Sequence, residues 1–109
     1  MILIETRAFA REREALLNAE EFRALQNDLL MHPERGDVIR GSGGARKARL
    51  KMRGRGKSGG GRVIYFYYVA ASRLYLLDCY SKSDEADLTP EQVSRLRRVI
   101  EAIRREKLL

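Results

Sequence analysis

The sequence predicts an α+β domain, in which a small, mostly antiparallel, twisted sheet carries helices on one side, two from the N-terminal part and one from the C-terminal part. Apolar residues recur at helical spacing near both ends of the chain, next to residues that cap helices. The stretch between them is rich in glycine, β-branched and aromatic residues, which favour strands and turns. With 109 residues, 44% of them apolar, the chain can build one modest core, so we expect a single domain over residues 1–109.

The first third of the chain predicts a strand followed by two helices. Met1–Glu5 alternates apolar residues and opens as a short strand. Thr6 can cap a helix that begins near Arg7, with a buried side formed by Phe9, Leu16 and Leu17. Asn18 is a second cap, with Glu21 three residues later as in a capping box. The helix that follows ends at His32-Pro33 and buries Phe22, Leu25, Leu29 and Leu30.

The middle of the chain predicts strands. Residues 36–52 hold too many glycines for a helix and predict two short strands joined by a turn. Residues 54–61 form a glycine-rich loop, and residues 62–70 are the strongest strand of the chain. After a turn at Ala71-Ser72, residues 73–82 return as its partner. Because these last two runs are almost continuously apolar, we expect them at the centre of the sheet.

The last helix begins with a complete start signal. Thr89 is its cap, Pro90 lies in its first turn, and Gln92 is the capping-box partner. An apolar stripe predicts that the helix packs on the protein's own sheet: Val93, Leu96, Ile100 and Ile103. Arginines lie off that line: Arg95, Arg98 and Arg105. The expected order of elements is therefore β-α-α-β-β-β-β-α.

Charge is distributed very unevenly along the chain. Residues 38–77 contain ten of the 22 Lys and Arg residues and no Asp or Glu. Residues 1–37 carry five basic and eight acidic groups, and residues 78–109 carry seven of each, so the middle supplies +10 of a net charge of +7. Cations without neighbouring carboxylates take their counter-charge from a partner, and this pattern favours phosphate. RNA or DNA is therefore the expected class of partner.

Several other classes are not expected. No run approaches the roughly 18 apolar residues of a membrane span, the N-terminus lacks the order of a secretory signal, and the basic segment is not a membrane-binding amphipathic helix. We expect a cytoplasmic protein. Cys79 is the only cysteine and His32 the only histidine, so we expect no internal disulfide, no metal and no cofactor. Gly54-x-Gly56-x-x-Gly59 has the spelling of a dinucleotide-binding loop, but it leads into a strand rather than a helix.

Basic side chains form the candidate site. Strand ends and starts meet at one edge of an antiparallel sheet, so five cations are expected to face one groove: Arg46, Lys47, Arg49, Arg62 and Lys82. The adjoining strand end and loop add cations that attract phosphate: Lys51, Arg53, Arg55 and Lys57. Tyr80 is the tyrosine best placed to stack on a base, while Cys79 is expected in the core and His32 at the dipole of its helix end. On this pattern alone, a solubilising basic face is an equal alternative.

The run HPERGDVIRGSGGARKARLKMRGRGKSGGGRVIYFYY, followed by LYLLDCYSKSDEADLTPEQ, resembles the RelE/HigB toxins of bacterial type II toxin–antitoxin modules. The likeness combines the glycine pattern, the basic pattern and the order of strands, and it extends from near the N-terminus to the last helix. It implies a small mRNA-cleaving toxin that acts in the decoding site of the ribosome. It also implies silencing by a co-encoded antitoxin, which we expect to bind DNA through a helix-turn-helix.

The resemblance assigns catalytic positions to four residues: Lys47, Arg49, Arg62 and Lys82. Some relatives carry an arginine directly after the lysine that corresponds to Lys82, and a tyrosine near the start of the last helix. Here those regions read Ser83 and Leu88-Thr89, so the group that acts on the attacking hydroxyl is not identified.

Cutting RNA without a metal requires the 2′-OH of the RNA itself to attack the adjacent phosphate. Arg62 suits clamping of that phosphate. Lys47 or Lys82 can act as the base only if its ammonium group first loses a proton; otherwise each lysine stabilises negative charge. Three hypotheses stay open: a ribosome-dependent mRNA endoribonuclease, which the resemblance favours; a gyrase inhibitor, as in a related branch; and a non-catalytic RNA-binding module.

Overall fold

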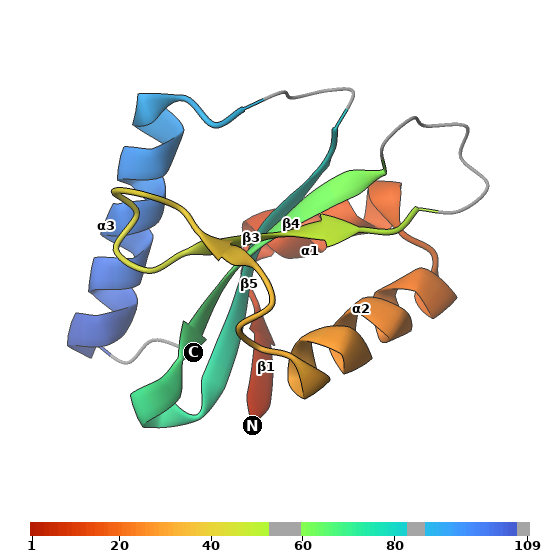
Figure 1. Ribbon diagram of the computed structural model, residues 1–109, viewed down its shortest axis with the longest axis horizontal. Coiled ribbons are helices and arrows are strands. Elements are labelled where there is room, and N and C mark those ends of the chain that lie inside the picture. The colour runs from red at the N-terminus through yellow and green to blue at the C-terminus, as the bar shows by residue number, and fades with distance from the viewer. Residues whose placement is uncertain (53–59, 83–86, 107–109) are drawn as a thin grey trace.

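One five-stranded sheet organises the chain in the computed structural model, which describes residues 1–52, 60–82 and 87–106 (Figure 1). The strands, in sheet order, are β1 (Ile2–Glu5), β5 (Arg73–Ser81), β4 (Gly61–Tyr68), β3 (Arg46–Leu50) and β2 (Asp37–Val38). All neighbours are antiparallel except β1 and β5, which are parallel. The two apolar runs, β4 and β5, lie in the inner part of the sheet as predicted.

Three helices complete the fold: α1 (Arg7–Leu16), α2 (Ala19–Met31) and α3 (Pro90–Glu106). The predicted order of elements is confirmed, with a short 3₁₀ turn at Val69–Ala71 between β4 and β5. No helix in the described ranges is long and apolar enough to cross a bilayer.

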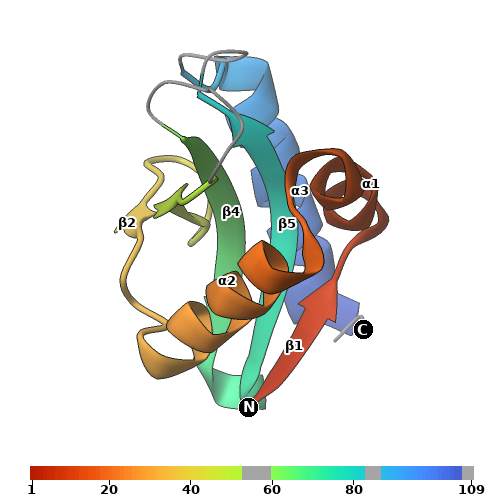
Figure 2. The same ribbon diagram turned by 90° about the vertical axis from the view of Figure 1, so that its right-hand side faces the viewer.

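The helices cover both faces of the sheet, so the prediction that they lie on one side is wrong (Figures 1 and 2). The first face packs on α1 and α2 through a cluster that includes Phe9, Leu25 and Leu29. The opposite face packs on α3 through Ile100 and Ile103. Both β4 and β5 are apolar on their two sides, and a strand of that kind needs a cover on each face. The predicted packing of the last helix on the protein's own sheet is confirmed.

Helix α3 is also held by Arg104, one of its last residues. The guanidinium group lies 4.9 Å from the ring centroid of Phe66 and 5.6 Å from that of Tyr68, and these two rings stack on each other. The same guanidinium donates to the carbonyl oxygen of Gly43 at 3.4 Å. Gly44, at φ +124°, crosses the ring of Phe66, where a Cβ would lie 3.3 Å from a ring carbon. A side chain at this position would therefore meet both steric crowding and backbone strain.

The predicted helix caps are all confirmed. The Asn18 side chain accepts from the backbone N–H of Glu21 at 2.7 Å, and the Glu21 carboxylate accepts from the N–H of Asn18 at 2.9 Å. Thr89 and Gln92 make the same reciprocal pair at 3.1 and 2.8 Å. Reciprocal caps of this kind satisfy N–H groups that have no partner inside the helix, which is why these sequences fix the helix starts.

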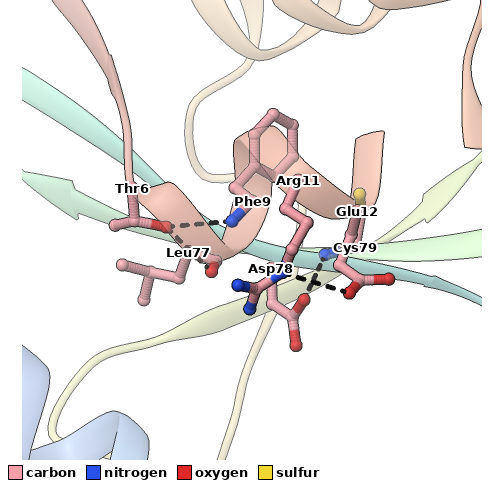
Figure 3. Close-up of polar contacts among 7 residues, drawn as sticks. All are labelled: Thr6, Phe9, Arg11, Glu12, Leu77, Asp78 and Cys79. Atoms are coloured by element: carbon pink, nitrogen blue, oxygen red, sulfur yellow. Dashed lines mark hydrogen bonds and ion pairs between the residues drawn. The ribbon is translucent and has the colours of Figure 1, made fainter. Parts of the chain in front are cut away.

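Thr6 caps α1 and also ties it to the sheet (Figure 3). Its hydroxyl oxygen accepts from the N–H of Phe9 at 3.2 Å, and the hydroxyl donates to the carbonyl oxygens of Leu76 and Leu77 at 3.0 and 3.1 Å. At this point β5 contains a bulge, because Ile64 pairs with Asp78 whereas the next residue of β4, Tyr65, pairs with Leu76. Leu77 is therefore an extra residue in β5, held by the cap of α1.

Candidate nucleic-acid interface

Strand β3 directs its cations to two different faces. Ala48 and Leu50 belong to the core that packs on α1 and α2, so by strand alternation Lys47 and Arg49 lie on the α3 side. Lys47 is half-buried and Arg49 is exposed. Neither forms an ion pair with any residue in the described part of the chain.

Strand β4 brings Arg62 next to them. Val63 faces the α1 and α2 core and Ile64 faces the α3 core, which places Arg62 on the α3 side. In the register of the sheet, Arg62 lies directly opposite Arg49 on β3 and opposite Tyr80 on β5. Arg62 is half-buried, and its Nη1 donates to the carbonyl oxygen of Gly61 at 2.8 Å.

Lys82 joins the same face because of the bulge in β5. Before the bulge, Tyr75 and Leu77 face α3; after it, Tyr80 does, and Cys79 faces the other core. An uninterrupted strand would have reversed the faces of Tyr80 and Cys79. Lys82 follows Tyr80 by two residues, and its N–H bonds to the carbonyl oxygen of Gly60 at 3.1 Å, so the pairing of the strands reaches this lysine. Lys82 is exposed.

Two cations of this face, Arg49 and Arg62, lie where like charges repel each other. Residues directly opposite on neighbouring antiparallel strands have Cβ atoms about 4.5–5.5 Å apart, and like charges there are unfavourable. Arg49 and Arg62 form such a pair, and the segment that holds both, residues 38–77, contains no carboxylate. Packing alone gives no reason to place two arginines opposite each other, whereas a bound polyanion does. We name Lys47, Arg49, Arg62 and Lys82 the cationic row.

Gly61 allows the strands to approach closely beside the cationic row, a role that the sequence analysis did not anticipate. A Cβ on Gly61 would lie 2.6 Å from the carbonyl oxygen of Tyr80 and 2.7 Å from the sulfur of Met52. The signal in the sequence was the run of three glycines that immediately precedes Arg62.

The prediction that Arg46 shares this face is wrong. Arg46 alternates with Lys47 and lies on the α2 side, where its Nη1 donates to the carbonyl oxygens of Glu34 and Gly36 at 3.1 and 2.8 Å. Tyr65 fixes the same segment: its hydroxyl accepts from the N–H of Gly36 at 2.9 Å and donates to the carbonyl oxygen of Pro33 at 2.8 Å. Burial raises the pKa of the Tyr65 phenol. Arg46 therefore holds the turn after α2 and does not line the candidate site.

The other predicted phosphate-binding residues have different outcomes. Lys51 is exposed and follows Lys47 and Arg49 in the alternation of β3. Tyr80 is only 8% exposed and its hydroxyl oxygen is buried, so it supports the floor beneath Arg62 and offers no open ring face for a base in this conformation. Base stacking on Tyr80 is thus not supported. Arg53, Arg55 and Lys57 lie outside the described residues.

Neither the cysteine nor the histidine belongs to the cationic row. Cys79 is fully buried in the core beneath α1 and α2, and burial, with a smaller contribution from the Asp78 carboxylate, raises the pKa of its thiol to about 12. A buried thiol of this kind is inert as a nucleophile at neutral pH, so its prediction as a core residue is confirmed. His32 is the exposed C-cap of α2. Among the described residues, no group of His, Cys, Asp or Glu could hold a metal ion.

Comparisons with known proteins agree with this geometry. Residues 4–107 match the model of the family described as the RelE toxin of the RelE/RelB toxin–antitoxin system. The structure of E. coli toxin RelE with two arginines replaced by alanine, in the free state, is similar with a TM-score of 0.59 and 18% identity, over 87% of this chain and 96% of that one. The toxin–antitoxin complex RelBE of E. coli has a TM-score of 0.55 and 18% identity, over 73% of this chain and 94% of that one. Isolated E. coli RelE has a TM-score of 0.55 and 16% identity, over 90% of this chain and 97% of that one.

The solved structures share the fold, and the family model spans almost the whole chain, including every residue of the cationic row. The chain therefore belongs to the RelE toxin family.

Proposed function

We propose that this chain is the toxin of a type II toxin–antitoxin module and that it inhibits translation by cutting mRNA on the ribosome, without a metal. One observation carries the proposal: four positive side chains lie on the same side of the sheet, with Arg49 and Arg62 directly opposite each other. Positive side chains gathered on a segment that contains no carboxylate are what a protein that binds phosphate presents.

The reaction that fits this face uses the RNA as its own nucleophile. The 2′-oxygen attacks the adjacent phosphorus, the bond from phosphorus to the 5′-oxygen breaks, and a 2′,3′-cyclic phosphate and a free 5′-hydroxyl result. The proton of the 2′-OH leaves to a base, and the departing 5′-oxygen takes up a proton. Negative charge grows on the phosphate oxygens meanwhile, and positive side chains already in place stabilise it.

Arg62 and Arg49 are the phosphate clamp in this mechanism. A guanidinium group keeps its proton and presents a planar fork to phosphate oxygens. Lys47 lies two residues before Arg49 on β3, and Lys82 lies two residues after Tyr80, directly past the end of β5. There they can exchange protons with the two reacting oxygens or stabilise charge.

The described part of the chain brings no histidine to this face, because His32 lies at the C-terminal end of α2. With no imidazole acid–base pair, chemistry on free RNA is expected to be slow. An mRNA held in line by the ribosome needs less from the enzyme, since a fixed geometry removes much of the entropic barrier. We therefore propose translating ribosomes as the site of action and a cognate antitoxin as the inhibitor.

The test is to map mRNA 5′ ends after induction of the toxin, with Arg62→Ala and Arg23→Ala as matched variants. Arg23 is an exposed arginine on α2, away from the cationic row. New 5′-hydroxyl ends within translated reading frames are expected with the wild type and Arg23→Ala, and not with Arg62→Ala. Double-strand DNA breaks with intact mRNA would instead support gyrase inhibition. Rapid cleavage of ribosome-free RNA would contradict ribosome dependence.

A further inference from the structure

Among the described residues, a neighbouring strand pairs with the outer edge of β3 at only two of its five positions. Strand β2 contributes two residues, Asp37 opposite Lys47 and Val38 opposite Arg46. Beyond Lys47, no strand in the described part of the chain pairs with this side of β3. An open strand edge is a template for another extended chain.

The backbone groups of the open part can be assigned from their neighbours. The carbonyl oxygen of Ala45 accepts from the N–H of Ile39 at 2.7 Å, so it points outward from the sheet, away from β4. That of Leu50 points inward, since a Cβ on Gly60 would lie 2.7 Å from it. The direction of the backbone N–H and C=O groups alternates from one residue of a strand to the next. Those of Lys47 and Arg49 therefore point outward like the carbonyl of Ala45, and those of Lys51 continue the series. The N–H and C=O groups of Arg49 and Lys51 thus form the open edge.

A cavity of about 840 Å³ lies beside this edge, between α2 and β3. Its apolar lining includes Ala24 and Leu25 from α2, and Leu50 and Met52 from the end of β3. Glu20, Glu21 and Asp28 of α2 line it as well, and Arg49 and Lys51 line it from the β3 side. Asp28 forms an ion pair with Arg35, which lies in the turn after α2. An apolar groove next to unpaired backbone groups has the two features that bind a peptide as an added strand.

We propose that the open edge of Arg49 and Lys51, together with the groove against α2, receives an extended segment of the cognate antitoxin in which apolar and acidic residues alternate. This inference rests on the proposed function, because it takes the partner to be an antitoxin. Five extended residues span about 17 Å, which is enough to follow residues 48–52.

The alternation of apolar and acidic residues in the antitoxin segment follows from the different surroundings on the two sides of β3. Side chains of an added strand on the α2 side enter the apolar groove, which Leu50 of β3 lines from the same side of the sheet. Side chains on the α3 side come to lie across from Arg49, about 4.5–5.5 Å away between Cβ atoms. Carboxylates there pair with the cationic row and occupy the position of the phosphate. An apolar-acidic strand would thus inhibit the toxin by binding at the edge of its site.

The first test is amide hydrogen exchange on the free toxin and on its complex with the protein encoded by the adjacent gene, co-expressed and purified together. Outward N–H groups of Arg49 and Lys51 should exchange fast in the free toxin and at least tenfold more slowly in the complex. Inward amides of Ala48 and Leu50 are the internal control, since β4 already pairs with them. Unchanged exchange at Arg49 and Lys51, with new protection at β1 or α3, would overturn the proposal. Protection of these two amides that rises with toxin concentration alone would also overturn it, because the occupant would then be a second copy.

The second test uses two matched substitutions of exposed helical alanines, Ala24→Arg in the groove and Ala15→Arg on α1. Ala24→Arg should weaken antitoxin binding at least tenfold, measured by titration calorimetry, while Ala15→Arg changes it less than twofold. Both variants should cut mRNA on ribosomes like the wild type. Equal affinities for the two variants would refute the inference, and so would slower mRNA cleavage with unaltered antitoxin affinity, which would make the groove an RNA site. If the wild-type protein binds the antitoxin through the groove but does not cut mRNA on ribosomes, the proposed function is refuted and this inference is not.

Discussion

Replacing Arg62 by alanine should separate the function of the cationic row from the stability of the fold. The repulsion from Arg49 and the hydrogen bond to Gly61 act on stability in opposite directions. Removing the charge relieves the repulsion from Arg49, which lies directly opposite, and this contributes roughly 0.2–1 kcal/mol in favour of the variant. Removing the guanidinium also deletes its hydrogen bond to Gly61, at 2.8 Å, which contributes about 0.5–1.5 kcal/mol in favour of the wild type. The free energy of unfolding should therefore stay within about 1 kcal/mol of the wild-type value.

The effect on cleavage should be much larger. A pre-positioned donor that stabilises charge on the reacting phosphate contributes about 2.7–4 kcal/mol to the transition state, so its loss slows the reaction roughly 10²–10³-fold. Arg62→Lys keeps the charge but loses the planar fork, and we expect an intermediate rate. Arg23→Ala, an equal loss of charge on α2, should cut at the wild-type rate.

Urea denaturation and single-turnover cleavage of mRNA on programmed ribosomes measure the two quantities separately. A loss of 2 kcal/mol or more in the free energy of unfolding would show that Arg62 is a structural residue. Wild-type cleavage by a folded Arg62→Ala protein would remove Arg62 from the site and refute the proposed clamp.

The remaining predictions concern groups that position the site. Thr6→Val removes the cap of α1 and the bond to the bulge of β5, so urea denaturation should show a loss of about 1–2 kcal/mol, with Thr6→Ser close to wild type. Tyr65→Phe leaves the buried N–H of Gly36 and the carbonyl of Pro33 without the phenol, and should cost about 1–3 kcal/mol by the same assay. Because burial raises the pKa of the Cys79 thiol from 9.0 to about 12, the native protein should resist iodoacetamide at about pH 8. The unfolded chain loses this proton first, so stability should fall as pH rises from 9.0 towards about 12, more steeply than in Cys79→Ala.

Local chemistry made much of the fold predictable. Helix starts depend on residues within one turn of each other, and the reciprocal pairs of Asn18 with Glu21 and Thr89 with Gln92 formed as the sequence indicated. The order of elements follows from runs of residues that favour one conformation, and the charge of residues 38–77 is a property of composition. Near neighbours in the chain carry all of this information.

Local sequence did not correctly predict on which face of the sheet every side chain or helix lies. The basic pattern predicted one face for Arg46 and Lys47, but alternation in β3 turns Arg46 to the α2 side, where its guanidinium group donates to the carbonyl oxygens of Glu34 and Gly36. The order of elements likewise predicted all helices on one side of the sheet, whereas they cover both faces. Which helix covers which face depends on the paths of the connections through space, and these are not encoded in any local pattern.

The bulge in β5 shows the physical reason most clearly. One extra residue, Leu77, reverses the faces of every later residue in the strand, so it brings Tyr80 to the side of Arg62 and sends Cys79 to the opposite core. Thr6, some seventy residues earlier in the chain, holds that residue through its hydroxyl. The amino-acid sequence by itself determined which residues carry the charge and which segments become strands. Only the tertiary structure decided that Lys47, Arg49, Arg62 and Lys82 share one face without Arg46, because that outcome depends on strand register and on a contact between distant segments.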